Sequence, residues 1–464
     1  MNNGKVIGYL PDERPPIWKL LLYSLQQVVV MFPATILVAL LTGFHVSTTI
    51  FASGFATICF VIVTGGKIPL YYGSSFSYLP AITTLMSLEA WKGFDLDTKI
   101  SYIQFGIIMS GLISIVAGLL IKLAGKRFID RILPATVTGP VAIIIGLSLA
   151  GTALKDASFD YAANAPSDLF WIVSGVTLIA TIIFSVYLKG VFGQLPLLLG
   201  PIVGCITAFI VQQVTGESLF RALPEEVAAT MGTSLFAVPH FTFPKISWVA
   251  VAALMPIALA TIPESTAHVY QLDIYVNDLA KKKNGKKYNI ASKLWLNLIG
   301  DGVGDMVSAS MGGPAGTNYG ENISAMAITK VFSSAVLIGA AIIAMVISFF
   351  TPLISALYAI PQAVIGGLEI YLFGAITAQG VAIMIDKKVD MFSSRNIAVI
   401  ATILVIGIGG QYAYGGNITI GGIELPCIAF AAIFGILINL FLSIGAKNES
   451  AAAEESVPAV EPEV

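Results

Sequence analysis

Apolar runs separated by short polar links recur along the whole chain. Residues 101–121, 170–187, 331–350 and 426–443 are examples, and each is close to the roughly 20 residues that a helix needs to cross the hydrocarbon of a bilayer. The pattern therefore predicts an all-α polytopic membrane protein with fourteen transmembrane segments. The expected segments are 17–43, 48–65, 68–86, 101–124, 135–153, 169–187, 193–214, 246–272, 294–311, 318–328, 331–350, 353–384, 395–412 and 424–444.

Composition agrees with this interpretation. Of the 464 residues, 56% are hydrophobic and 11% are charged, whereas about 25% of the residues in a soluble domain are charged. The three cysteines lie in apolar runs and far apart in the sequence. They are expected to be small core residues rather than a disulfide or a metal site.

The distribution of basic residues predicts the orientation. With fourteen segments and a cytoplasmic N-terminus, only five of the 25 Lys and Arg residues fall outside, namely Lys92, Lys99, Lys155, Arg221 and Lys245. Such an excess on the cytoplasmic side is what the positive-inside rule requires. We therefore expect a multi-pass protein of the inner (plasma) membrane with both termini in the cytoplasm.

The polar ends and links add little chemistry. Residues 1–19 are polar and contain three prolines, so no signal peptide is expected. The basic loop 281–287 is explained by topology, although a patch for nucleic acid or anionic lipid is the alternative, and no nucleic-acid partner is expected. The Ala-, Glu- and Pro-rich tail 451–464 is predicted to be disordered.

Two of the predicted segments are interrupted in matching places. Segment three contains Pro69, Gly73 and Pro80, and segment ten, counted from Gly312 to include the residues that lead into it, contains Pro314 and Gly316. Each is third in its group of seven, which indicates two inverted repeats with a binding site near the middle of the membrane. Backbone amides freed by the breaks need partners at that depth, and a polar ligand would supply them.

Four carboxylates, Glu264, Asp301, Asp305 and Glu321, lie in or beside apolar segments. An ionisable group in hydrocarbon costs at least about 2.5–3.5 kcal/mol, so such residues normally mark a path for a substrate or an ion. The sequence therefore favours a transporter.

Glu264 and His268 are four residues apart, so they share one face of a helix. Such a pair can pass a proton, although a buried pair that only locks two helices together is the alternative. As a metal site the pair is weak, because no first histidine of an H-E-x-x-H motif precedes it. No metal, cofactor or catalytic residue is expected.

Residues 317–322, TNYGEN, place Glu321 directly after Gly320 at the expected start of a half-helix. The helix dipole favours an ionised acid there, and a carboxylate can accept two N–H donors from the edge of a planar ligand. Helix capping by Asn318 or Glu321 is the alternative. Phe76 is able to stack on a flat ring, although core packing is the default for an aromatic residue.

These residues resemble a known family. Gln26 and Gln27, the sequence GKIPLYYGSSFSYLPA at 66–81, Glu264 with His268, and YGENISAMAITKVFS at 319–333 are similar to the bacterial uracil permeases and the wider nucleobase/ascorbate transporter family. The resemblance extends from about residue 13 to residue 446.

The resemblance implies two inverted groups of seven segments, usually in a homodimer, with short strands in segments three and ten. It implies a core domain at 17–124 and 246–350, a gate domain at 125–245 and 351–446, and cytoplasmic ends at 1–16 and 447–464. It also implies a proton-coupled symporter, a secondary active transporter with H⁺ as the coupling ion, which imports a small nucleobase by alternating access.

By the same resemblance, Phe76, Glu264, Gly320 and Glu321 are expected to bind the base, and His268 to take part in proton coupling.

The chain also departs from the family pattern. Gln27 stands where many members have histidine, and Asp301 stands where uracil-transporting relatives have Asn. The Asp is similar to that of purine and xanthine transporters, so Asp301 is a second candidate for proton coupling and favours a purine base. A uracil permease is the alternative. Asp305 and Asn322, like Gln27, are possible accessory residues.

Three rival functions fit the sequence less well. A sulfate or bicarbonate transporter of the same fold would hold its anion at half-helix amides, but two carboxylates in the pocket would repel the anion. A membrane-embedded enzyme is disfavoured because no catalytic motif is present. A passive channel is disfavoured because no repeated pore signature is present. The sequence pattern assigns no role to Glu369, which is expected at the gate or at the dimer contact.

Overall fold

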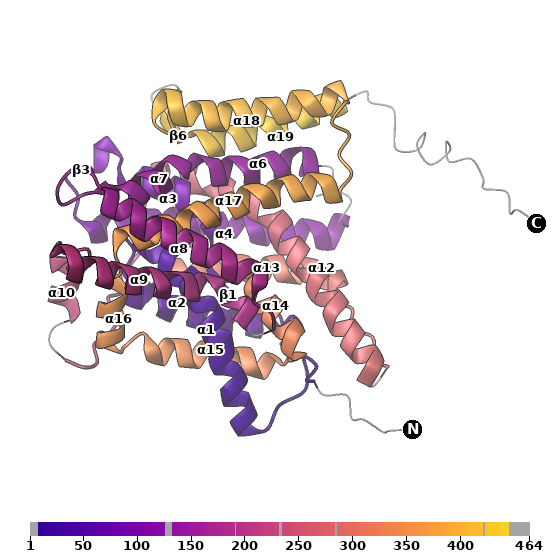
Figure 1. The fold of residues 1–464 in the computed structure, drawn as a ribbon. Coiled ribbons are helices and arrows are strands. Elements are labelled where there is room, and N and C mark those ends of the chain that lie inside the picture. The colour runs from indigo at the N-terminus through magenta and orange to yellow at the C-terminus, as the bar shows by residue number, and fades with distance from the viewer. Residues whose placement is uncertain are drawn as a thin grey trace, which may run out of the picture.

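The computed structural model is a bundle of helices that run roughly side by side (Figure 1). It describes residues 8–125, 132–190, 192–231, 234–283, 285–420 and 423–444. The predicted cytoplasmic tail 447–464 lies outside the described residues. In the described part, nine helical stretches are long and apolar enough to cross a membrane. This agrees with a multi-pass membrane protein, while the count of fourteen segments stays a prediction.

The first half of the chain forms these helices: α1 (Ile17–Thr42), α2 (Val46–Val63), α3 (Leu79–Met86), α4 (Leu96–Ala124), α6 (Ala135–Ser148), α7 (Ala150–Ser158), α8 (Asp168–Tyr187), α9 (Pro196–Thr215) and α10 (Glu225–Met231). The second half forms α11 (Trp248–Leu254), α12 (Ala258–Lys283), α13 (Leu294–Ser310), α14 (Gly320–Thr329), α15 (Ser334–Ile347), α16 (Thr351–Tyr358), α17 (Gln362–Asp386), α18 (Ser394–Tyr414) and α19 (Cys427–Ser443).

Several predicted segments have different boundaries in the structure, among them the following two. The segment expected at 246–272 continues to Lys283, beyond the apolar run, and is divided by a short 3₁₀ turn over Met255–Ile257. The segment expected at 353–384 is two helices, α16 and α17, because Pro361 lacks the backbone N–H that a continuous helix would use.

The expected strands in the two broken segments are present. β1 (Tyr72–Ser74) and β4 (Gly316–Asn318) pair antiparallel, with Gly73 opposite Thr317. A Cβ on Gly73 would lie 2.4 Å from the ring of Tyr319, so only glycine permits this approach. The strands satisfy each other's backbone groups in the interior of the bundle, which is the condition for broken helices at membrane depth.

Two further hairpins, absent from the prediction, lie in links between long helices. β2 (Phe159–Asp160) pairs with β3 (Ala165–Pro166), and β5 (Asn417–Ile420) pairs with β6 (Ile423–Pro426). Both are antiparallel and close the short connection between two helices.

The helices pack in two groups. In one group α13 packs on α4 and α2, and α15 packs on α1 and α2; in the other, α17 packs on α6, α7 and α8, and α18 packs on α19 and α6. Small residues allow close contact: a Cβ on Gly111 of α4 would lie 2.6 Å from the carbonyl oxygen of Gly302 on α13. Small residues at helix contacts are typical of membrane bundles. The division of the chain into a core domain and a gate domain stays a prediction.

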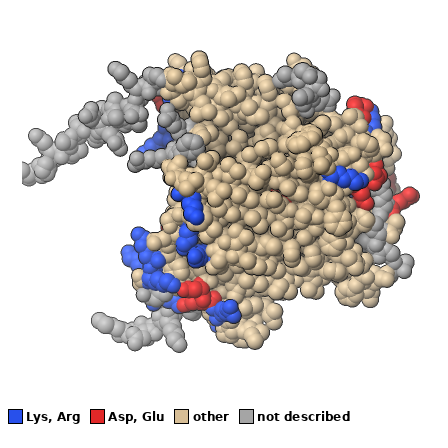
Figure 2. Space-filling view, turned by 180° about the vertical axis from the view of Figure 1, so that it is seen from behind, with Lys and Arg blue, Asp and Glu red and all other residues tan. Residues whose placement is uncertain are grey.

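The N-terminal segment is fixed to one end of the bundle. Lys283 at the end of α12 donates to Glu13 at 2.5 Å and to the carbonyl oxygen of Gly8 at 2.7 Å. Lys286 pairs with Asp12 at 2.6 Å, and its hydrogen bond is the main reason why the pKa of Asp12 is lowered. Figure 2 shows Lys and Arg side chains gathered mainly at one end of the molecule in that view.

Candidate functional site

A cavity of about 360 Å³ lies where the two broken segments meet. Its volume falls in the range of roughly 300–1,000 Å³ that small-molecule sites occupy. The 3₁₀ turn that begins at Phe76 follows β1, and α14 follows β4, so both half-helices begin at the cavity wall. Their free N–H groups and positive dipole ends therefore lie beside the space.

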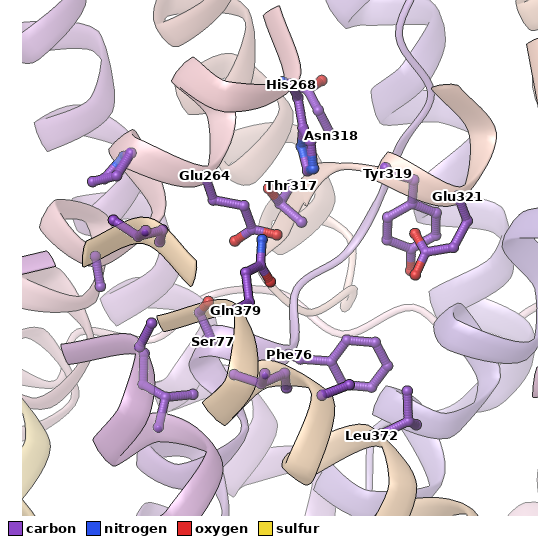
Figure 3. Close-up of a pocket in the computed structure, with 18 of the residues that line it drawn as sticks. Phe76, Ser77, Glu264, His268, Thr317, Asn318, Tyr319, Glu321, Leu372 and Gln379 are labelled. Carbon is purple, nitrogen blue, oxygen red and sulfur yellow. The ribbon is translucent and has the colours of Figure 1, made fainter. Parts of the chain in front are cut away.

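Glu264 and His268 both line this cavity from α12 (Figure 3). Ser77, at the start of the first half-helix, lines the cavity close to the Glu264 carboxyl group. The ring of His268 lies near the backbone of Asn318, and its Nδ1 has no hydrogen-bond partner within the described residues. Among these residues no hydrogen bond joins Glu264 to His268, so the two act on the cavity as separate groups.

Glu321 lines the same cavity from the first turn of α14, as its position in the sequence predicted. Gly320 begins the helix, and a Cβ there would lie 2.9 Å from Nε2 of His268. Glycine at this position therefore lets the helix start approach the imidazole. Phe76 lines the cavity together with Leu372 of α17 (Figure 3). All the residues predicted to bind substrate thus border one space.

Asp301 does not line the cavity but contacts Asn318, a residue that does. One of its carboxylate oxygens accepts from Nδ2 of Asn318 at 2.8 Å, and the other accepts from Nδ2 of Asn297 at 3.0 Å. Asn318 lines the cavity whereas Asp301 does not. The acid therefore holds a cavity residue in place and has no surface against a bound molecule.

Asp305 joins the two crossing strands. Its Oδ1 accepts from the hydroxyl of Tyr72 in β1 at 2.5 Å and from the backbone N–H of Gly316 in β4 at 2.8 Å. The same carboxylate oxygen therefore contacts both strands, one through a side chain and one through the backbone. This acid, which the sequence left without a place, stabilises the crossing.

Gln27 and Asn322 form a second supporting contact. Nδ2 of Asn322 donates to the Oε1 of Gln27 at 2.8 Å and to its backbone oxygen at 3.0 Å. Neither residue lines the cavity. The pair fixes α14 to α1 immediately next to Glu321, so its effect on the site is indirect.

Glu369 lies away from the cavity, fully buried in α17, which packs on α7 and α8. Within the described residues neither of its carboxyl oxygens has a hydrogen-bond partner. It lies near Asp156, which borders a separate hollow together with Arg221 and Gln362.

The sequence interpretation did not identify Gln379 and Thr138, which line the cavity from α17 and α6. Figure 3 shows the Gln379 amide pointing toward the Glu264 carboxylate. For Gln379 the signal in the sequence was a lone amide side chain in the apolar run 372–385. These residues place polar groups of the second helix group against the acids of the first.

The site combines acceptors, a group that both donates and accepts, and an aromatic face. Two carboxylates can accept N–H groups, the Gln379 amide can do both, and the Phe76 ring can lie against a flat surface. Such a set fits a small, flat, neutral molecule whose edge carries N–H and C=O groups.

Comparison with known proteins gives matches along nearly the whole chain. A family model described as the Permease family matches residues 18–414. The uracil permease of Bacillus caldolyticus is 36% identical over 437 residues, covering 93% of this chain and 94% of the relative. The uracil permease of Bacillus subtilis is 34% identical over 444 residues, with 93% and 94% covered. That of Escherichia coli K12 is 31% identical over 435 residues, with 93% of each chain covered.

Solved structures confirm the inverted-repeat transporter fold. The transmembrane domain of a cyanobacterium bicarbonate transporter, BicA, matches with a TM-score of 0.58 at 14% identity, covering 91% of this chain and 96% of that one. The murine Solute Carrier 26 family member A9 anion transporter matches with a TM-score of 0.63 at 12% identity, covering 94% of this chain and 70% of that one. Identities this low support the fold alone.

Proposed function

Because the chain belongs to the permease family of nucleobase and ascorbate transporters, we propose that it carries a nucleobase across the membrane by alternating access. Permeases are transport proteins and not enzymes. The observation that carries the proposal is that Glu264 and Glu321, from two different helices, border one cavity at the crossing of the broken segments.

Uracil is the proposed substrate. Three relatives at 31–36% identity are uracil permeases, and they do not support the purine preference that Asp301 suggested. The hydrogen bonds of Asp301 weaken that preference further, because this acid contacts Asn318 and does not line the cavity. The uracil alternative therefore replaces the purine base.

The cavity offers a match for each edge of uracil. In the proposed mode, Glu264 and Glu321 accept the ring N–H groups, and the amides at Phe76 and Gly320 face the ring oxygens. The Phe76 ring lies against the flat face of the base. Gln379 closes the site from α17, so that binding links the two helix groups.

Proton coupling is proposed to involve Asp301, His268 or Glu264. His268 and Glu264 border the cavity, and Asp301 reaches it through Asn318. A proton would neutralise the carboxylate of Asp301 or Glu264, or would give His268 a positive charge that offsets a nearby carboxylate. Either change would lower the cost of moving the loaded site across the hydrocarbon. Asp301 is the first candidate, because a proton on it would disturb the hydrogen bonds that hold Asn318.

Uptake into proteoliposomes tests the proposal. Labelled uracil should accumulate against its gradient when the outside is acidic, a protonophore should abolish the accumulation, and unlabelled uracil should compete better than xanthine, hypoxanthine or guanine. Stronger competition by a purine would restore the purine alternative. Uptake that depends on sodium and is unchanged by the protonophore would rule out proton coupling. Uptake without accumulation would rule out active transport.

An anion is the second candidate, because the solved structures of the same fold include a bicarbonate transporter and an anion transporter. The carboxylates of Glu264 and Glu321 would repel a bound anion at close range. Binding of uracil that sulfate and bicarbonate leave unchanged is therefore expected.

A further inference from the structure

Two of the three histidines of the chain meet a carboxylate far from the cavity. His45 precedes α2, Asp97 lies in the first turn of α4, and His240 lies in the link between α10 and α11. Nε2 of His45 is 2.9 Å from Oδ1 of Asp97, and Nε2 of His240 is 2.7 Å from Oδ2. α1 runs from the N-terminal segment to Thr42, so this cluster lies at the end of the bundle opposite that segment.

The donor atoms converge from three separate parts of the chain. One nitrogen from each histidine and a carboxylate oxygen all lie within 4.8 Å of one another, and the two imidazole rings have centroids 4.6 Å apart. Around a tetrahedral ion with bonds of about 2.1 Å, ligand atoms are about 3.4 Å apart. Small changes in side-chain torsion would therefore suffice to place all three atoms around one ion.

The backbone on either side of the ligands is held in place. The carbonyl oxygen of His240 accepts from Thr48 at 2.6 Å, and the backbone N–H of Val46 donates to the hydroxyl of Tyr358 at 3.0 Å. Two residues beyond His240, Thr242 exchanges hydrogen bonds with Gln104 of α4. The link therefore presents its histidine from a fixed position.

The cluster is open to water on one side. The side chain of His45 is 5% exposed, whereas those of His240 and Asp97 are 31% and 41% exposed. An ion could enter from solution and keep a water molecule as its fourth ligand, as metal sites with three protein ligands do. Two imidazoles and one carboxylate suit Zn²⁺ and its neighbours in the first transition row, whereas Mg²⁺ and Ca²⁺ prefer oxygen ligands.

We propose that His45, Asp97 and His240 form a binding site for a divalent transition-metal ion such as Zn²⁺. The bound ion ties the link before α11 to the starts of α2 and α4. Sequence motifs could not reveal the site, because its ligands are separated by 52 and 143 residues.

Zn²⁺ titration by calorimetry tests the site on the full chain, purified with a tag that contains no histidine and with its three cysteines alkylated. One Zn²⁺ per chain is expected for the unchanged protein, and no comparable binding of Mg²⁺. His240→Ala should weaken binding by at least about tenfold, a loss that even a residue supporting a metal ligand can cause. His240→Cys should restore Zn²⁺ binding, because thiolate is also a zinc ligand. The new cysteine must stay unmodified, so the two His240 variants are compared in a chain whose three native cysteines are replaced by serine instead of alkylated.

His268→Gln is the matched control, because it removes the remaining histidine and should leave Zn²⁺ binding unchanged. The melting temperature without metal shows whether each variant is folded, and Asp97→Asn gives a second removal of a ligand. A folded His240→Ala protein that binds Zn²⁺ as tightly as the unchanged protein would overturn the proposal, as would absence of binding to the unchanged protein. The cluster would then be a hydrogen-bonded contact only.

Discussion

Replacing Glu264 by glutamine should weaken uracil binding strongly while leaving the fold intact. The two side chains have nearly the same shape, but the amide presents its own N–H₂ group where the carboxylate accepts a hydrogen bond. Hydrogen bonds to charged groups contribute about 1.5–3 kcal/mol, which corresponds to roughly a 10- to 150-fold increase in Kd at 1.4 kcal/mol per factor of ten. Glu321→Gln should have an effect of similar size.

Calorimetric titration of purified protein with uracil measures the effect. Glu369→Gln is the control, because Glu369 is a fully buried acid that does not line the cavity. Uracil should bind this variant as tightly as the unchanged protein, provided that its melting temperature shows a folded chain. If folded Glu264→Gln and Glu321→Gln variants both retain full affinity, the carboxylates do not hold the base and the proposed binding mode is wrong.

Three further substitutions separate the roles of other residues. Gly320→Ala places a Cβ 2.9 Å from Nε2 of His268. Crowding of this kind costs about 1–3 kcal/mol, so the helix start should shift and uracil affinity should fall. Unchanged affinity in calorimetry would contradict the close approach. Asp301→Asn should abolish the pH dependence of proteoliposome uptake; if that dependence persists, the proton assignment moves to His268 or Glu264. Tyr72→Phe removes the hydroxyl that donates to Asp305 and should lower unfolding stability by about 1–3 kcal/mol in denaturant titration, with uracil affinity nearly unchanged; a larger loss of affinity than of stability would place Tyr72 in the site.

The sequence was sufficient for the features that depend on local patterns. Apolar runs predicted the long helices, and the interruptions around Gly73 and Gly316 predicted the two broken segments. Those segments form paired strands in the structure. The spacing of Glu264 and His268 placed both on one face of α12, where both reach the cavity. In each case the relevant neighbours are a few residues apart, or the break has a characteristic composition.

The contacts of the second helix group could not be predicted in the same way. Gln379 reaches the cavity because α17 packs beside α6, and a single amide in an apolar run does not show which way its side chain faces. The metal-ligand cluster has the same origin, because the link before α11 brings His240 to the start of α4. Tertiary packing over long sequence separations decides both.

The structure divides the buried acids by their partners, a distinction that the sequence does not contain. Glu264 and Glu321 line the cavity wall, whereas Asp301 and Asp305 accept hydrogen bonds from side chains and backbone of the crossing strands. In an apolar run all four have the same signature of a costly charge. An acid with protein donors already supplied has little to offer a ligand. An acid that faces a cavity gains donors when a substrate arrives, so the same cost of burial becomes a source of binding energy.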